Sequence, residues 1–194
     1  AVACDYPDLA SAITDLELRG ISASVTFNIT MGTYPGYNVI RDFPKAASNL
    51  QVYFNALNGV SFSMTPVNDY GYQNYFFRLA GAKNLSFSGF SMALQPFNKQ
   101  SIFFVLDGRC ENISLAQLNF NLNNSLNSYN FGISTGDFQG TNLQISSCTF
   151  NGGSTGIHIP GYYWATLSYT GVDVTNCSFT NVSAPISIQK AMDV

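Results

Sequence analysis

Three adjacent aromatic residues form the most suggestive binding motif in the chain. They are Tyr162, Tyr163 and Trp164, they follow Pro160-Gly161, and Trp164 is the only tryptophan. Aromatic side chains on a loop can stack on sugar rings or anchor a contact with another protein. The alternative is a loop whose rings fold back over the protein's own surface. We take Tyr162, Tyr163 and Trp164 as the candidate ligand-binding residues and keep packing as the competing interpretation.

Acidic and basic residues offer a candidate catalytic site. A glycoside hydrolase needs two carboxyl groups about 5 to 10 Å apart, and a pectate-lyase-like site needs acidic calcium ligands beside an Arg or Lys base. The available residues are Asp107, Asp137 and Asp173, with Arg109 and Lys83 as bases. Aspartates are also common in turns for backbone reasons. We therefore expect no catalytic residue, metal or cofactor, and any activity would be that of a polysaccharide lyase or glycoside hydrolase.

His158 is the one histidine of the chain and falls between Ile157 and Ile159. If the two isoleucines face inward on a strand, the alternation of side chains points His158 outward. A catalytic triad needs a nucleophile and a carboxylate beside the histidine, and no motif supplies them. We interpret His158 as a surface or structural residue.

The composition favours one β-rich domain over residues 1–194. Hydrophobic residues make up 46% of the chain, enough for a sizeable core, whereas charged residues make up only 10%. The formal charge is −3, and the eight Lys and Arg residues are scattered. Nucleic-acid binding is not expected, because phosphate contacts need clustered cations. No apolar run reaches the roughly 18 to 20 residues of a transmembrane helix.

The first twenty residues differ from the rest of the chain. Apolar residues recur there at helical spacing and a glycine closes the pattern: Leu9, Ala12, Ile13, Leu16 and Gly20. This spacing predicts a short amphipathic helix at about residues 7–19, within an N-terminal helical cap formed by residues 1–20. The period then changes to two, as in Val25-Thr26-Phe27-Asn28-Ile29, so strands are expected throughout 21–194.

A nine-residue pattern recurs four times, beginning at Asn84, Asn112, Asn142 and Gly171, with a period of about 29 residues. Apolar residues occupy its second, fourth, seventh and ninth positions, so each copy reads as two short strands around a corner. A degenerate copy is expected at residues 59–64, about one period before the first. Another strand recurs between the copies, at Phe77 and Leu79, Phe104 and Leu106, Ile133, Ile157 and Ile159, and Ile186 and Ile188.

Three short strands in each repeat of about 29 residues predict an all-β, right-handed parallel β-helix, because such a coil buries its apolar face only against identical neighbours. Like residues would stack as interior columns: Leu85, Ile113, Leu143 and Val172; Phe87, Leu115, Ile145 and Val174; Phe90, Leu118, Cys148 and Cys177; Met92, Phe120, Phe150 and Phe179. A β-sandwich, with its strands at short and regular intervals, is the competing fold, but it does not require a fixed repeat.

Two columns contain residues with polar or reactive groups. Stacked amides of Asn84, Asn112 and Asn142 would hydrogen-bond along the solenoid and tolerate a left-handed backbone, so their role is structural. Cys148 and Cys177 would be neighbours in one interior column. A disulfide and two reduced thiols both stay open there, because stacked Cβ atoms lie about 4.8 Å apart and a bridge needs roughly 3.5 to 4.5 Å.

Three motifs stand close together at the start of the chain: Asp5-Tyr6-Pro7-Asp8-Leu9-Ala10-Ser11-Ala12-Ile13, Gly20-Ile21-Ser22-Ala23-Ser24-Val25-Thr26-Phe27-Asn28-Ile29 and Gly32-Thr33-Tyr34. Together they resemble the start of pectin-lyase-like β-helix domains of large secreted surface proteins of Bacteroidota-type bacteria. The similarity covers about the first 35 residues, and the later repeats are generic coils. It implies an extracellular or cell-surface location and a helix that caps the open end of the solenoid.

The sequence therefore predicts a noncatalytic extracellular structural or adhesive module, with glycans or surface proteins as partners. A carbohydrate-binding or polysaccharide-cleaving module is the alternative, because of the aromatic loop and because many enzymes share the fold. A phage or filament component is a third possibility, since open-ended β-helices can stack end to end. Residues 185–189 begin another coil, so we expect the chain to be the N-terminal part of a longer protein.

Overall fold

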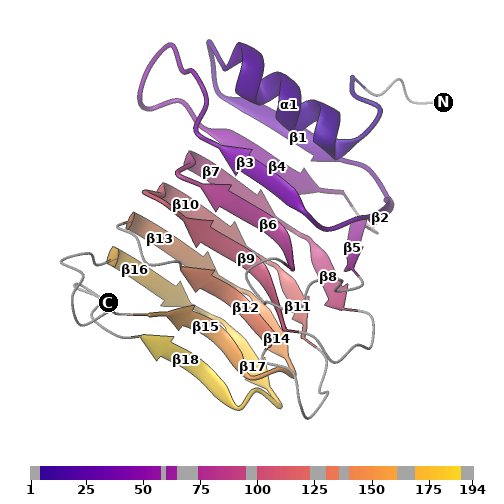
Figure 1. The fold of residues 1–194 in the computed structure, drawn as a ribbon, viewed down its shortest axis with the longest axis vertical. Helices are drawn as coiled ribbons and strands as arrows, with labels where there is room; N and C mark the ends of the chain where they lie inside the picture. The colour runs from indigo at the N-terminus through magenta and orange to yellow at the C-terminus, as the bar shows by residue number, and fades with distance from the viewer. Residues whose placement is uncertain are drawn as a thin grey trace.

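The computed structural model is a parallel β-solenoid with one helix at its N-terminal end (Figure 1). It describes residues 5–57, 60–64, 74–94, 100–122, 130–135, 140–160 and 169–188. Each of its three sheets has six strands, and every strand pairing among these residues is parallel. The all-β parallel β-helix predicted from the repeats is confirmed.

The chain visits the three sheets in turn, so each rung contributes one strand to each sheet. The first sheet contains β1 (Val25–Ile29), β4 (Val52–Ala56), β7 (Lys83–Ser88), β10 (Glu111–Ala116), β13 (Gly140–Ser146) and β16 (Tyr169–Thr175). The second contains β2 (Gly32–Tyr34), β5 (Val60–Met64), β8 (Ser91–Leu94), β11 (Asn119–Asn121), β14 (Thr149–Asn151) and β17 (Ser178–Thr180). The third contains β3 (Asn38–Arg41), β6 (Tyr75–Ala80), β9 (Ser101–Asp107), β12 (Asn130–Thr135), β15 (Thr155–Ile159) and β18 (Ala184–Ile188).

The strand register reproduces the interior columns expected from the repeats. In the first sheet one column is formed by Leu85, Ile113, Leu143 and Val172, and the next by Phe87, Leu115, Ile145 and Val174. The second sheet aligns Met92, Phe120, Phe150 and Phe179. The third aligns Phe77, Phe104, Ile133, Ile157 and Ile186. Residues in equivalent positions of the repeat therefore lie one above another along the solenoid.

The prediction that residues 59–64 are a degenerate copy of the repeat is wrong, because this segment does not align with the strand that begins the other copies. Phe62 lies on β5 in the second sheet, where its partner is Met92. The true equivalent of Phe87 is Phe54 on β4, with which it pairs in the first sheet. An alternating apolar pattern looks the same in all three sheets, so it does not reveal which sheet a strand joins when one rung is longer than the rest.

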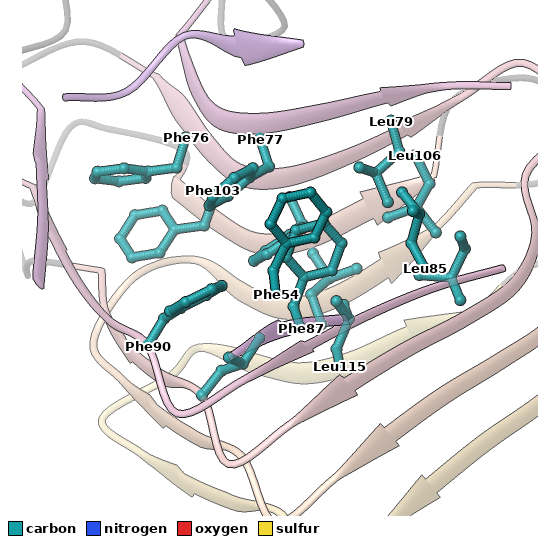
Figure 2. Packing of buried hydrophobic residues seen from close by; sticks show 14 of the residues in the cluster. Phe54, Phe76, Phe77, Leu79, Leu85, Phe87, Phe90, Phe103, Leu106 and Leu115 are labelled. Atoms are coloured by element: carbon teal, nitrogen blue, oxygen red, sulfur yellow. The ribbon is translucent and has the colours of Figure 1, made fainter. Parts of the chain in front are cut away.

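Stacked phenylalanine rings fill the core (Figure 2). The rings of Phe54 and Phe87 lie 5.0 Å apart and 9° from parallel. Those of Phe120 and Phe150 lie 4.5 Å apart at 2°. These distances match the roughly 4.8 Å between paired strands, so ring stacking follows from the strand spacing.

A further interior column lies at the start of the third-sheet strands. It holds aromatic residues on the earlier rungs and glycines on the later ones. Its members on the second to fifth rungs are Phe76, Phe103, Gly132 and Gly156. A Cβ on Gly132 would lie 2.6 Å from the Phe150 ring, and one on Gly156 would lie 2.6 Å from the Phe179 ring. Both positions therefore require glycine, because a larger side chain there would overlap a phenylalanine ring of the second sheet. Figure 2 shows Phe76 and Phe103 side by side on the other rungs.

The predicted N-terminal helix is present as α1, Leu9–Arg19. The side chain of Asp8 accepts a hydrogen bond from the backbone N–H of Ser11 at 2.7 Å, so Asp8 is the N-cap. The apolar face points into the end of the solenoid, and its buried residues are Leu9, Ala12, Ile13 and Leu16. Gly20 ends the helix with φ 67°, and a Cβ there would lie 2.1 Å from the carbonyl oxygen of Pro44.

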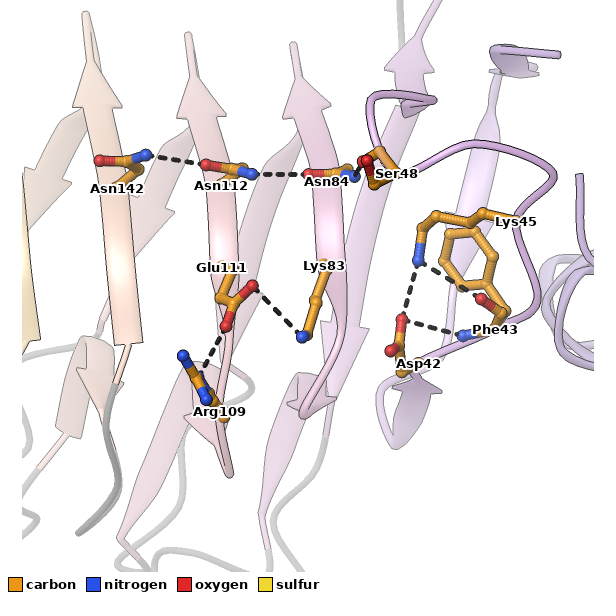
Figure 3. A network of polar contacts seen from close by, with 10 residues as sticks. All are labelled: Asp42, Phe43, Lys45, Ser48, Lys83, Asn84, Arg109, Glu111, Asn112 and Asn142. Carbon is orange, nitrogen blue, oxygen red and sulfur yellow. Dashed lines mark hydrogen bonds and ion pairs between the residues drawn. The ribbon is translucent and has the colours of Figure 1, made fainter.

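The asparagine column expected at the corner before each copy is confirmed (Figure 3). Asn84, Asn112 and Asn142 have φ values of 58°, 55° and 56°, in the left-handed region. The Nδ2 of Asn142 donates to Oδ1 of Asn112 at 2.8 Å, and the Nδ2 of Asn112 donates to Oδ1 of Asn84 at 2.7 Å. At the end of the ladder Asn84 donates to the carbonyl of Ser48 at 2.7 Å. Gly171 occupies the next position with φ 65°.

Substitutions at Asn112 separate the two roles of this column. We expect Asn112→Gly to lower the free energy of unfolding by about 1 to 2 kcal/mol, because two amide hydrogen bonds are lost. Asn112→Ala should cost about 1 kcal/mol more, because alanine must adopt the left-handed backbone. Urea unfolding followed by circular dichroism measures both, with Ser114→Ala on the same strand as a near-neutral control. Equal losses for glycine and alanine would contradict the backbone requirement, and no loss for glycine would contradict the amide ladder.

Candidate functional site

The aromatic motif predicted to bind ligands, Tyr162 to Trp164, lies outside the described residues. In the chain it falls between β15 in the third sheet and β16 in the first. Its role in binding therefore stays a prediction.

The candidate acidic residues are not brought together as a catalytic pair in the part of the chain that the structure describes. Asp107, at the end of β9, is bound by the guanidinium of Arg78 one rung earlier, with Nε 2.9 Å from Oδ2. Asp173 is exposed on β16, where its register partner is Gln144. Two to three rungs separate Asp107 from Asp173, roughly 10 to 14 Å along the solenoid, which exceeds the spacing of glycosidase carboxyl groups. Asp137 lies outside the described residues.

The two candidate bases share a carboxylate that the sequence reasoning missed. Glu111 binds Lys83 with Nζ to Oε2 at 3.2 Å and Arg109 with Nε to Oε1 at 2.7 Å (Figure 3). Lys83 and Glu111 are register partners on β7 and β10, which explains the contact. Only the strand register could have revealed this pair, because the two residues lie a full repeat apart in the chain. Both cations are thus held in surface ion pairs rather than directed at a substrate cavity.

His158 lies between the buried residues Ile157 and Ile159 on β15, as the alternation indicates. Its register partners are Ser134 and Ser187, and its ring centroid is 5.2 Å from that of Phe131. Partial burial lowers the pKa of His158, so the imidazole is neutral at pH 7. The adjacent register positions on β12 and β18 hold serines and no carboxylate, so they do not complete a triad.

Cys148 and Cys177 are free thiols in the structure, which selects the reduced alternative of the two left open by the sequence. Each sulfur lies near backbone oxygens, with Cys148 Sγ 3.4 Å from the carbonyl oxygen of Ser146 and Cys177 Sγ 3.4 Å from that of Thr175. Burial raises the pKa of the Cys148 thiol to about 12. Cys177 is only half-buried. The pair therefore packs as small apolar side chains.

A groove of about 650 Å³ lies between α1 and strand β1 of the first rung. Its apolar floor includes Phe27, Ile29 and Tyr34, and Leu57 at one end is 48% exposed. The Tyr6 hydroxyl donates to Oδ2 of Asp15 at 2.7 Å on the helix side, and this hydrogen bond is the main cause of a raised pKa for Tyr6. No sequence pattern indicates this groove, because the helical periodicity predicts a cap without showing how much of the coil it covers.

The described residues contain no cluster of three or more metal-ligating side chains. Within those same ranges no helix has both the length and the apolar character needed to cross a membrane. Comparison of the chain with protein-family models, curated proteins and solved structures finds no match.

The thiols provide a test of the buried column. A pKa of about 12 leaves Cys148 almost entirely protonated at pH 8, with a thiolate fraction near 10⁻⁴ by order of magnitude. We expect iodoacetamide to alkylate Cys177 at least about tenfold faster than Cys148 in the native protein, because the thiolate is the nucleophile and Cys177 is more exposed. Peptide mass spectrometry measures both rates. Equal alkylation rates in the native protein would contradict the burial of Cys148. If neither thiol is alkylated after unfolding without a reductant, the two cysteines form a disulfide.

Proposed function

We propose that this chain is a noncatalytic structural or adhesive module that works outside the cell. The observation that carries the proposal is the continuous column packing, which extends through six rungs in each sheet. Such a stack makes a stiff rod in which each rung stabilises its neighbours. A rod of this kind suits the display of loops at a distance from an anchoring point.

The surface chemistry supports the same proposal. Outward positions of the first sheet carry mostly neutral hydrogen-bonding residues, such as Ser86, Ser114 and Gln144, which align in one row. On the same sheet Lys83 pairs with Glu111, and Asp173, which continues the row beyond Gln144, is exposed. A neutral polar face can contact glycans or proteins through many hydrogen bonds without a strong dependence on charge. Glycans and surface proteins are therefore the partners we propose.

The opening motifs add support for the location. They resemble pectin-lyase-like domains of secreted surface proteins, and the segment that carries the resemblance forms the cap helix and the first rung, α1 to β2. The solenoid agrees with that fold class. On this basis we propose an extracellular or cell-surface location and a relationship to that family.

A carbohydrate-binding function is the second candidate, favoured by the three consecutive aromatics at 162–164. Polysaccharide cleavage has less support, because Asp107 and Asp173 are too far apart and the bases Lys83 and Arg109 are engaged by Glu111. End-to-end assembly is a third candidate, since Ile186 in the last described rung is 43% exposed.

Two assays distinguish these functions. Under the leading proposal, polysaccharides incubated with the protein, with calcium or with a chelator, release no new reducing or unsaturated ends. Beads coated with the protein should nevertheless be retained on surfaces coated with extracellular glycoproteins. A glycan array then compares the intact chain with Trp164→Ala, and Tyr53→Ala on β4 serves as an aromatic control outside the loop.

Each outcome points to one function. Retention that persists in Trp164→Ala supports an adhesive rod whose contact lies elsewhere on the surface. Specific glycan binding lost in Trp164→Ala but kept in Tyr53→Ala favours the carbohydrate-binding function. Release of sugar fragments would overturn the noncatalytic proposal, and failure of the beads to bind any surface would count against adhesion.

A further inference from the structure

Among the described residues, no strand covers one edge of strand β1. It is the terminal strand of the first sheet, and its partner β4 lies on one side only (Figure 1). The Val25 N–H donates to the Gln51 carbonyl at 3.0 Å, and the Ile29 carbonyl accepts from Leu57 at 2.9 Å, so these residues direct their backbone groups to β4. Alternate residues of a parallel strand direct those groups to opposite sides. The N–H and C=O groups of Thr26 and Asn28 therefore point toward the uncovered edge.

The groove between α1 and the first rung follows this edge. All six residues from Val25 to Thr30 line it, including Thr26 and Asn28, whose side chains point away from the core. Its volume of about 650 Å³ lies within the range of binding sites for small molecules and short segments. An edge strand that borders a preformed groove is the arrangement to which extended peptides add as a further strand.

The floor of the groove is apolar. Phe27 is only partly buried: its ring stacks on Phe54 at 5.2 Å, and the tilted Tyr6 ring lies 5.9 Å from it within the groove. Tyr34 is likewise half-buried and packs on Phe62 at 5.4 Å. An added strand in register with β1 would place alternate side chains over the exposed part of Phe27, beside the Tyr6 ring. Apolar residues are required at those positions.

The helix side of the groove is acidic. Asp5, Asp8 and Asp15 line it. Asp15 pairs with Arg19 at 2.7 Å, whereas neither Asp5 nor Asp8 forms an ion pair within the described part of the chain. The hydrogen bond from the backbone of Ser11 lowers the pKa of Asp8, so its carboxylate stays charged. This excess of negative charge complements a ligand with Lys or Arg side chains.

We propose that this groove binds an extended segment of a partner protein in which apolar and basic residues alternate. The backbone of the segment pairs with Thr26 and Asn28, its apolar side chains cover Phe27 and Tyr34, and its basic side chains reach Asp5 and Asp8. The site is independent of the adhesive function proposed above, because it lies at the capped end rather than on the neutral sheet faces.

A synthetic peptide of seven residues, alternating lysine and valine and blocked at both ends, serves as the probe for the 194-residue chain. Fluorescence anisotropy measures its binding, and nuclear magnetic resonance follows hydrogen exchange of the Thr26 and Asn28 amides. We expect these amides to exchange about tenfold or more slowly with saturating peptide, while the Leu143 amide in the middle of the solenoid is unchanged. A peptide with every second amide N-methylated should not bind.

Charge variants test the acidic rim. Asn preserves the N-cap and the shape of the side chain, so the double variant Asp5→Asn with Asp8→Asn should fold normally. At low salt its affinity for the lysine–valine peptide should be about fivefold or more lower than that of the unsubstituted protein. Added salt should lower the affinity of the unsubstituted protein toward that of the double variant. Glu17→Gln is the matched control, because Glu17 lies on the same helix but binds Arg41 outside the groove.

Several results would overturn the proposal. One is no binding of the lysine–valine peptide, or binding equal to that of a glutamate–valine peptide. Another is binding that leaves the exchange of Thr26 and Asn28 unchanged. A third is slow exchange of both amides without peptide. If the exchange rate does not depend on protein concentration, a segment of the same chain occupies the groove. If exchange slows further as the protein concentration rises, a second copy of the protein occupies it.

Discussion

The stacking of parallel strands at a fixed spacing is the constraint on which the rest of this structure depends. Each rung sets its residues directly over those of the previous rung, so every interior position must suit the residues above and below it. Phenylalanine meets this condition by ring stacking, as Phe150 does on Phe179 at 4.8 Å. Asparagine meets it at the corner, where the backbone of Asn112 is left-handed and its amide joins two neighbours. The described charged residues lie outside the columns, and several of them pair there, as Lys83 does with Glu111.

The sequence repeat predicted most of the fold, because stacking at a fixed spacing makes apolar residues recur at equivalent positions of each repeat. Columns through Leu143 and Phe150 follow directly from the alignment of the copies, and the helix follows from the spacing of its apolar face. The interior positions of Phe76 and Phe103 do not, because they break the alternation of their strands and are replaced by Gly132 and Gly156 on later rungs. That exchange depends on the volume that rings from another sheet occupy, which is a property of the packed coil.

The candidate site was less predictable for the same reason. Glu111 meets Lys83, and Asp107 meets Arg78, only because the register brings distant residues together. The groove depends on how α1 sits over the first rung. No local pattern encodes either arrangement. The interior side chains are needed for packing between rungs. Residues that bind partners are therefore expected in the loops, on the outer faces and at the ends of the rod. The groove beside β1 belongs to these regions.

The most direct test of the stacked architecture is the contact pattern between Leu143 and Val172 on β13 and β16. Nuclear Overhauser spectra of methyl-labelled protein should show backbone contacts between these strands together with methyl contacts from Ile113 to Leu143 and from Leu143 to Val172. Ile113 and Val172 lie two rungs apart, about 10 Å, and should show no comparable contact. Methyl contacts between Leu143 and Val172 without backbone contacts would place them on facing sheets and contradict the solenoid.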